Sequence, residues 1–158
     1  MSNSKSPEPG SKAAAFSLET DGGDKVSLKD FAGKPLVLYF YPKDDTPGCT
    51  KEALDFTASA SAFKKLGASV IGVSKDTVAA HDKFKKKHKL NVILASDPDG
   101  KVIEAYGSWV EKSMYGRKYM GIDRSTFLID SKGKIAQIWR KVRVPGHVEE
   151  VLEAARAL

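Results

Sequence analysis

The residue best suited to chemistry in this sequence is its single cysteine, Cys49, which lies where a loop changes into a helix. The loop, residues 41–50, reads YPKDDTPGCT, and its prolines and glycine interrupt regular structure. The start of a helix presents unpaired N–H groups and a positive dipole end, which can lower a thiol pKa from about 8.5 to between about 3.5 and 7.5. This position predicts a reactive thiolate, although the cysteine count alone favours a buried, unreactive side chain.

A lowered pKa does not by itself make a thiol an efficient catalyst. A fall to about 6 would raise the thiolate fraction at neutral pH roughly thirtyfold. With a Brønsted slope of about 0.4 to 0.5, the same fall costs on the order of tenfold in nucleophilicity, so the net gain is a few-fold. Asp44 and Asp45 would, if close to the sulfur, raise the thiol pKa again. The site therefore needs a cationic partner.

The elements around the loop predict an α/β fold. Apolar, β-rich runs indicate five strands, at residues 35–41, 69–73, 91–95, 125–130 and 134–139. Apolar residues at helical spacing indicate helices at residues 50–66, 77–90 and 148–158, with Asp76 as the N-cap of the second.

The order of these elements determines how the strands pair. The first three strands alternate with helices, so they should be parallel, whereas the three-residue loop 131–133 makes the last two antiparallel. A small hairpin is predicted from residues 16–18 and 25–28, which flank Asp21, Gly22 and Gly23. We therefore expect a central mixed β-sheet flanked by helices, with an N-terminal β-hairpin extension.

Length and composition indicate one globular domain. The chain has 158 residues, of which 41% are hydrophobic and 29% charged. We expect a flexible N-terminal arm over residues 1–12 and a single domain over residues 13–158. No apolar run approaches the roughly 18 to 20 residues that cross a bilayer, and no secretory leader pattern is present. Together with the single cysteine, this indicates a cytoplasmic protein that does not contact a membrane.

The formal charge of +6 raises the alternative of a nucleic-acid binder. The densest basic run shares its helix with apolar residues at helical spacing, which is typical of a solvated helix face. No aromatic or arginine side chains alternate with these lysines to stack on bases. The lysines of the run are at positions 83, 85, 86, 87 and 89. We therefore expect no nucleic-acid partner.

Three separated segments of the chain resemble one known family. They are the pattern P-x-x-x-T-x-x-C formed by Pro42, Thr46 and Cys49, the preceding residues 28–41 with the sequence LKDFAGKPLVLYFY, and residues 109–130, which include YGR and GIDRSTFLID. In this order they resemble the peroxiredoxins of the Q type, also called bacterioferritin comigratory proteins. The resemblance covers most of the chain from about residue 13 onward. It implies a thioredoxin-like fold and a thiol-dependent peroxidase that reduces hydrogen peroxide and organic hydroperoxides without cofactor or metal.

The resemblance also implies a role for four residues. Cys49 resembles the peroxidatic thiolate, which becomes a sulfenic acid, and Arg124 the guanidinium that lowers the thiol pKa and meets charge on the leaving oxygen. Thr46 resembles the hydroxyl that holds thiolate and peroxide, and Pro42 the wall that keeps water from the sulfur. The plainer alternatives are a surface ion pair for Arg124, a turn or helix cap for Thr46 and ordinary loop punctuation for Pro42.

The chain departs from the family pattern in having no second cysteine. Many Q-type members carry a resolving cysteine where this chain has Leu54 or Lys85. The sequence thus resembles a one-cysteine variant, whose sulfenic acid needs an external thiol such as glutathione, glutaredoxin or thioredoxin. We expect a monomer or weak dimer.

The other candidate residues indicate packing or surface positions. His81 and His88 lie on one predicted helix face without a third metal ligand, so surface histidines are expected, and Trp109 and Trp139 are expected to pack. There is no glycine-rich phosphate loop and no C-x-x-C. The remaining alternative to an enzyme is a thioredoxin-fold binding or holding protein with a non-catalytic cysteine.

Overall fold

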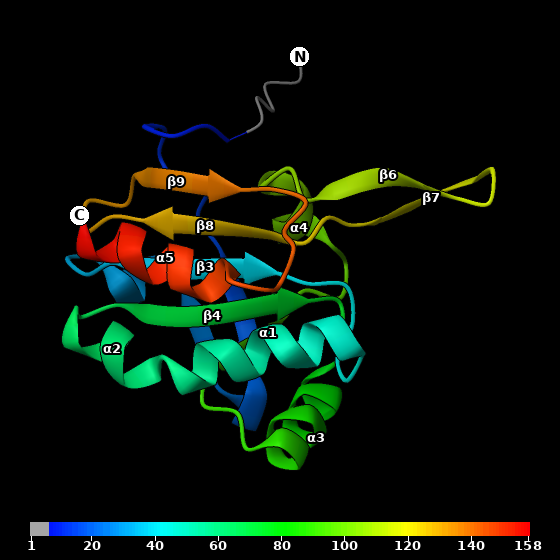
Figure 1. The fold of residues 1–158 in the computed structure, drawn as a ribbon, viewed down its shortest axis with the longest axis horizontal. Helices are drawn as coiled ribbons and strands as arrows, with labels where there is room; N and C mark the ends of the chain where they lie inside the picture. Colours follow the sequence, from blue (N-terminus) through cyan, green and yellow to red (C-terminus); the bar gives the residue numbers. More distant parts are fainter. Residues whose placement is uncertain (1–6) are drawn as a thin grey trace.

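The computed structural model describes residues 7–158, and its centre is a mixed seven-stranded sheet (Figure 1). The strand order is β2-β1-β5-β4-β3-β8-β9, and β6 and β7 form a separate two-stranded ribbon. The strands are β1 Ser17–Thr20, β2 Lys25–Ser27, β3 Leu36–Phe40, β4 Ser69–Ser74, β5 Ile93–Ser96, β6 Trp109–Met114, β7 Arg117–Ile122, β8 Ser125–Ile129 and β9 Ile135–Trp139. The helices are α1 Pro47–Ala58, α2 Ala60–Lys65, α3 Val78–His88, α4 Lys101–Ala105 and α5 His147–Arg156, with short 3₁₀ turns at Asp21–Gly23 and Leu28–Phe31.

The pairing of the strands confirms the predicted mixed sheet. Strands β3, β4 and β5 are parallel and are joined by helical crossovers, whereas β8 and β9 are antiparallel. The N-terminal hairpin β1–β2 is also present, and β1 extends the sheet by pairing antiparallel with β5. Strand β3 lies centrally, with β4 on one side and β8 on the other. The loop that follows β3 therefore starts from the most buried part of the sheet.

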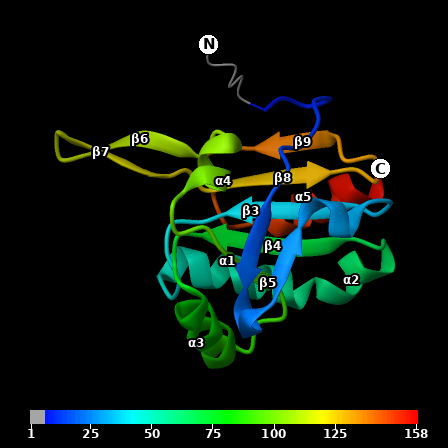
Figure 2. The same cartoon turned by 180° about the vertical axis from the view of Figure 1, so that it is seen from behind.

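Both faces of the sheet are covered, because the side chains of β3 alternate between two cores. Val37 and Tyr39 point into a core built with α1, α2, α3 and α5, and Tyr39 stacks on Phe56 of α1 with 4.7 Å between ring centroids. Leu38 and Phe40 point into the opposite core, which contains α4 and the N-terminal segment. Figures 1 and 2 show α1, α2 and α5 over one face and α4 behind the other.

The helix boundaries differ from the predicted ones in two places. The predicted helix 50–66 is two helices, because Ser59 leaves the helical conformation (φ −97°, ψ 7°) between α1 and α2. The prediction of Asp76 as the N-cap of α3 was wrong. The N-cap is Thr77, whose Oγ1 accepts a hydrogen bond from the N–H of Ala80 at 3.1 Å. The carboxylate of Asp76 instead accepts from the hydroxyl of Ser74 at 2.6 Å.

The ribbon β6–β7 and the short helix α4 were not predicted. The ribbon projects from the body of the protein (Figures 1 and 2), so its side chains lack the buried alternation that marks a strand in sequence. Its turn places Tyr115 and Gly116 at φ 53° and 79°, which suits a tight two-residue hairpin. The last residue of β7, Ile122, is buried again and leads the chain to Arg124.

The predicted arm over residues 1–12 lies partly outside the described residues, which start at position 7. Within the described part, the N–H of Gly10 donates to Ile135 O at 2.7 Å, and the N–H of Ile135 donates to Ser11 O at 2.9 Å. Residues 10–12 thus run beside β9, and the boundary between arm and domain stays a prediction. Across residues 7–158, none of the helices has both the length and the apolar character needed to cross a bilayer.

Gly72 provides a test of the packing beneath α1. A Cβ added to Gly72 would lie 2.6 Å from Cζ and 2.7 Å from the hydroxyl oxygen of Tyr39, whose ring is held by the core. We expect Gly72→Ala to lower the free energy of unfolding by about 1–3 kcal/mol, measured by urea denaturation, because the ring cannot move freely. Gly121→Ala is the control, since there the nearest atom is the flexible stem of Lys112 at 3.2 Å. Equal, negligible effects of both substitutions would contradict the described packing.

Candidate active site

Cys49 lies in the first turn of α1, where the loop after β3 enters the helix. Thr46 is the N-cap residue, and its C=O accepts the first helical hydrogen bond from Thr50 N–H at 2.8 Å. Pro47 follows at the first helical position, where a missing N–H costs nothing. Cys49 is 2% exposed and unpaired, and it belongs to the core beneath α1. The helix starts earlier than the predicted residue 50, so Cys49 is the third residue of α1 and belongs to the first turn, whose N–H groups have no partner within the helix.

The cation that the structure places beside the thiol is Arg124, the residue that the family resemblance suggested. Phe40 at the end of β3 pairs with Ser125 at the start of β8. The loop that leaves β3 and the residues that precede β8 therefore lie at the same end of the sheet. The guanidinium nitrogen Nη2 of Arg124 donates to Cys49 Sγ at 3.4 Å. Gly48 permits this approach, because a Cβ there would lie 3.0 Å from the same nitrogen. The side chain of Arg124 is 17% exposed, so its guanidinium is partly buried rather than on the open surface.

A third member of the site, Glu52, was missed in the sequence. It lies one turn after Cys49 on α1, is fully buried, and its Oε1 accepts from Nη1 of Arg124 at 2.8 Å. Burial raises the pKa of Glu52 to about 7, although the charge of Arg124 opposes the rise. Burial lowers the pKa of Arg124, but Glu52 and Cys49 outweigh burial and raise this pKa above its ordinary value. The sequence did contain a signal for Glu52, because a residue three positions after Cys49 lies on the same face of the helix.

The other two predicted site residues lie near the thiol in the chain but do not contact the sulfur through a hydrogen bond in the described structure. The hydroxyl of Thr46 donates to Lys43 O at 2.9 Å. Pro42 is exposed at the start of the loop. The structure thus brings Cys49 and Arg124 together, whereas the roles expected for Thr46 and Pro42 stay predictions.

The loop is held in place by a buried histidine, which corrects the expectation of a surface position for His81. His81 is fully buried, and its Nδ1 lies 2.7 Å from Asp44 Oδ2. Its Nε2 lies 3.0 Å from Ala95 O, and the hydroxyl of Tyr41 donates to Asp44 Oδ1 at 2.6 Å. Both ring nitrogens face acceptors, which the doubly protonated imidazolium satisfies. Burial lowers the pKa of His81, but the hydrogen bond and charge of Asp44 outweigh burial and raise it.

The second loop carboxylate, Asp45, also turns toward α3 rather than toward the thiol. It contacts Lys87 Nζ at 2.7 Å and His88 Nε2 at 2.8 Å. Hydrogen bonds from these two side chains lower the pKa of Asp45. Asp44 and Asp45 could have disfavoured a thiolate at Cys49, but both carboxylates pair with side chains of α3.

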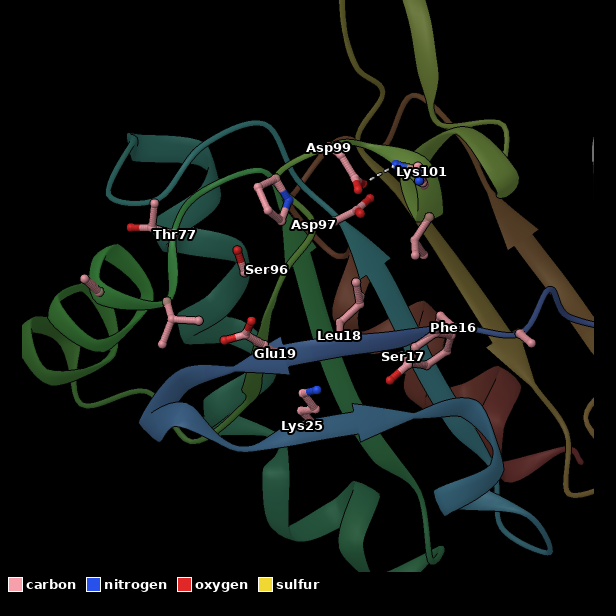
Figure 3. Close-up of a pocket in the computed structure, with 15 residues that line it drawn as sticks. Phe16, Ser17, Leu18, Glu19, Lys25, Thr77, Ser96, Asp97, Asp99 and Lys101 are labelled. Carbon is pink, nitrogen blue, oxygen red and sulfur yellow. Dashed lines mark hydrogen bonds between the residues drawn. The ribbon is translucent and has the colours of Figure 1, made fainter.

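A separate pocket of about 720 Å³ lies between β1 and the start of α4, and Cys49 does not line it (Figure 3). Its carboxylates are used structurally: Asp97 accepts from Ile103 N–H at 2.8 Å, and Asp99 accepts from Lys101 N–H at 3.1 Å. In the described part of the chain, no group of three or more His, Cys, Asp or Glu side chains is arranged to hold a metal ion. The predicted packing of the tryptophans is confirmed, since Trp109 and Trp139 lie against the two cores.

A thioredoxin-like sheet with a thiol at a helix start, held against a partly buried guanidinium, defines a thiol-dependent peroxidase. The sequence profile described as the AhpC/TSA family matches residues 9–138. The chain belongs to this family and, within it, to the peroxiredoxins of the Bcp or Q type. The resemblance stated from the sequence is thereby confirmed.

Similar proteins extend over nearly the whole chain. The putative peroxiredoxin bcp of Coxiella burnetii is 54% identical over 145 residues, covering 92% of this chain and 96% of that protein. Peroxiredoxin Bcp of Bacillus subtilis is 50% identical over 149 residues, covering 94% and 95%. A crystal structure of a cysteine-to-serine mutant of Xylella fastidiosa PrxQ has a TM-score of 0.92 at 39% identity, covering 97% and 98%. The bacterioferritin comigratory protein of Xanthomonas campestris has a TM-score of 0.86 at 46% identity, covering 90% of each chain.

The buried pair of His81 and Asp44 predicts a pH-dependent stability. Because the pKa of His81 is raised on folding, the pair should contribute fully below pH 6.5, the ordinary histidine value, and less as pH rises through the folded pKa. We expect His81→Asn to lower the free energy of unfolding by about 3 kcal/mol in mildly acidic buffer, measured by urea denaturation, and to remove this decline.

Tyr41→Phe is the matched control for His81→Asn. It deletes the hydrogen bond to Asp44 at 2.6 Å but keeps the histidine–carboxylate pair. Its stability should fall by a similar amount at each pH, with the slope of the wild-type protein retained. If the free energy of unfolding depended on pH in the same way in wild type and His81→Asn, His81 would not be the cause of the pH dependence.

Proposed function

We propose that Cys49 is the peroxidatic thiolate of this peroxidase and that Arg124 is its electrostatic partner. The observation that carries the proposal is the 3.4 Å contact between Arg124 Nη2 and Cys49 Sγ, made in the first turn of α1. A cysteine that only filled core space would need no guanidinium beside it. This contact therefore favours a catalytic thiol over the alternative of a binding or holding protein.

The proposed reaction reduces hydrogen peroxide and organic hydroperoxides. The Cys49 thiolate attacks the terminal oxygen of the peroxide, an S–O bond forms, and the O–O bond breaks. Sulfur is oxidised to a sulfenic acid, and the leaving oxygen takes a proton to become water or an alcohol. Arg124 stabilises the negative charge that grows on that oxygen. A similar protein from Xanthomonas campestris was studied for alkyl peroxide reduction, which supports including organic hydroperoxides.

Thr46 and Pro42 are assigned supporting roles in the same proposal. The hydroxyl of Thr46 donates its hydrogen bond to Lys43 O. The lone pairs of the hydroxyl oxygen therefore remain to accept a hydrogen bond from the incoming peroxide. Pro42 has no N–H to attract water and stands at the start of the loop. These positions support a peroxide held by Thr46 beside the sulfur and a dry wall provided by Pro42.

The electrons for the second half of the cycle must come from outside the chain. Cys49 is the only cysteine. At the two positions where the family resemblance suggests a second thiol, this chain has Leu54, which is exposed, and Lys85, which pairs with Asp21 at 2.8 Å. We assign resolution of the sulfenic acid to an external thiol such as glutathione, glutaredoxin or thioredoxin. Such reductants suit a cytoplasmic monomer or weak dimer.

The lysines of α3 do not favour the nucleic-acid alternative. Lys85 pairs with Asp21, and Lys87 pairs with Asp45 at 2.7 Å, so part of the positive charge is neutralised within the protein. We therefore assign no nucleic-acid or membrane partner.

Repeated turnover tests this function and the need for an outside thiol. We expect sustained peroxide consumption with glutathione, a thioredoxin system or dithiothreitol. When no thiol is added, consumption should stop after one peroxide for each oxygen atom that Cys49 takes up. Intact-mass analysis should then show sulfenic, sulfinic or sulfonic acid, or a bridge between two molecules, at Cys49.

The matched variant is Cys49→Ser, which is nearly isosteric and should retain less than about one per cent of the activity, because a serine hydroxyl is a far poorer nucleophile. Sustained turnover without any reductant would contradict the one-cysteine cycle. Residual activity above about one per cent in Cys49→Ser would show that Cys49 is not the peroxidatic residue.

A further inference from the structure

One cation serves two acidic groups in this site. Arg124 donates through Nη2 to Cys49 Sγ at 3.4 Å and through Nη1 to Glu52 Oε1 at 2.8 Å. Across residues 7–158, this is the one ion pair that Glu52 makes. A thiolate and a carboxylate together would carry two negative charges against one positive charge, in a place where Cys49 and Glu52 are 2% and 0% exposed. Such an excess of buried charge is costly.

The hydrogen bonds around Glu52 also indicate a neutral carboxyl group. Its second oxygen, Oε2, is buried without a partner, and so is the hydroxyl of Tyr39. In the described residues these are the two buried side-chain oxygen or nitrogen atoms in that state. An ionised carboxylate with one unpartnered oxygen loses its hydration without replacement, whereas a protonated carboxyl loses much less.

Within residues 7–158, no other group facing Glu52 supplies a second positive charge. Tyr39 from β3 and Asp55 from α1 are a phenol and a carboxylate, and Asp55 is paired with Lys51 at 2.6 Å. His147 of α5 packs on Phe56, and burial lowers its pKa to about 4, so it is neutral at physiological pH. The charge of Arg124 must therefore be divided between Cys49 and Glu52.

We propose that Glu52 holds a proton while Cys49 reacts, so that the Arg124 charge is matched by the thiolate alone. This inference rests on the proposed roles of Cys49 and Arg124. When Glu52 ionises, its charge competes for the guanidinium, so Arg124 stabilises the thiolate and the leaving oxygen less. Glu52 is thus a positioning residue that acts through Arg124 and sets an upper pH limit on reactivity. Burial raises the pKa of Glu52 to about 7, which places this limit near neutrality.

The test compares wild type with Glu52→Gln, which keeps an oxygen to accept from Arg124 and removes the ionisable group. The second-order rate with hydrogen peroxide in wild type should rise as the thiol ionises and then fall about three- to tenfold as Glu52 loses its proton. In Glu52→Gln the falling limb should disappear. Asp55→Asn is the matched control, because it removes a carboxylate from the same helix that does not contact Arg124. Its falling limb should persist with the amplitude of wild type and lie at lower pH, since the charge of Asp55 helps to raise the pKa of Glu52.

A measurement independent of activity separates this inference from the proposed function. Loss of the Glu52 proton, followed by the infrared band of the protonated carboxyl group, should occur at lower pH in Cys49→Ser than in wild type, because no thiolate then competes for Arg124. Identical carboxyl titrations in the two proteins, or a falling limb that persists in Glu52→Gln, would overturn the inference. Wild-type protein that consumes no peroxide would refute the function of Cys49, while the carboxyl titration would still decide whether Glu52 and Cys49 compete.

Discussion

A guanidinium held beside a buried sulfur is the interaction on which the rest of this structure depends. The thiol and the cation come from distant parts of the sequence, and only the sheet brings them together. Strand β3 delivers the loop and α1 that carry Cys49, and the antiparallel register that pairs Phe40 with Ser125 places Arg124 at the same edge. Gly48 removes the one Cβ that would obstruct the contact. The fold therefore keeps a buried thiol and a guanidinium at short distance from each other.

The negative groups nearby are arranged so that this contact persists. The loop that holds Cys49 contains two aspartates, which could have opposed a thiolate. Asp44 is bound to the buried His81, and Asp45 is bound to Lys87 and His88, so α3 takes up both charges. Glu52 remains as the one carboxyl group that shares Arg124 with the sulfur. The protonation state of that carboxyl group then links the reactivity of the thiol to pH, because a neutral Glu52 leaves the guanidinium to the sulfur.

Much of the fold and part of the site follow from the sequence, and the remainder depends on contacts that no local pattern records. The central strands and the helix-start position of Cys49 are predicted from apolar spacing, proline and glycine. Arg124 was identified by resemblance, because periodicity gives no sign that a residue 75 positions away meets the sulfur. His81 was misassigned to the surface, since helical spacing does not tell which polar side chain finds a buried carboxylate. The ribbon β6–β7 was missed because it is largely exposed and lacks a buried face.

The peroxide rate and the thiolate titration of Arg124→Met test the central contact most directly, with Arg124→Lys as the variant that keeps a charge. Methionine retains the apolar stem and removes the cation that meets both the sulfur and the leaving oxygen. The account predicts a rate at least about tenfold lower in Arg124→Met, with thiolate formation moved to higher pH, and partial recovery in Arg124→Lys. An unchanged rate and an unchanged titration in Arg124→Met would show that the guanidinium does not activate Cys49, and the account would be wrong.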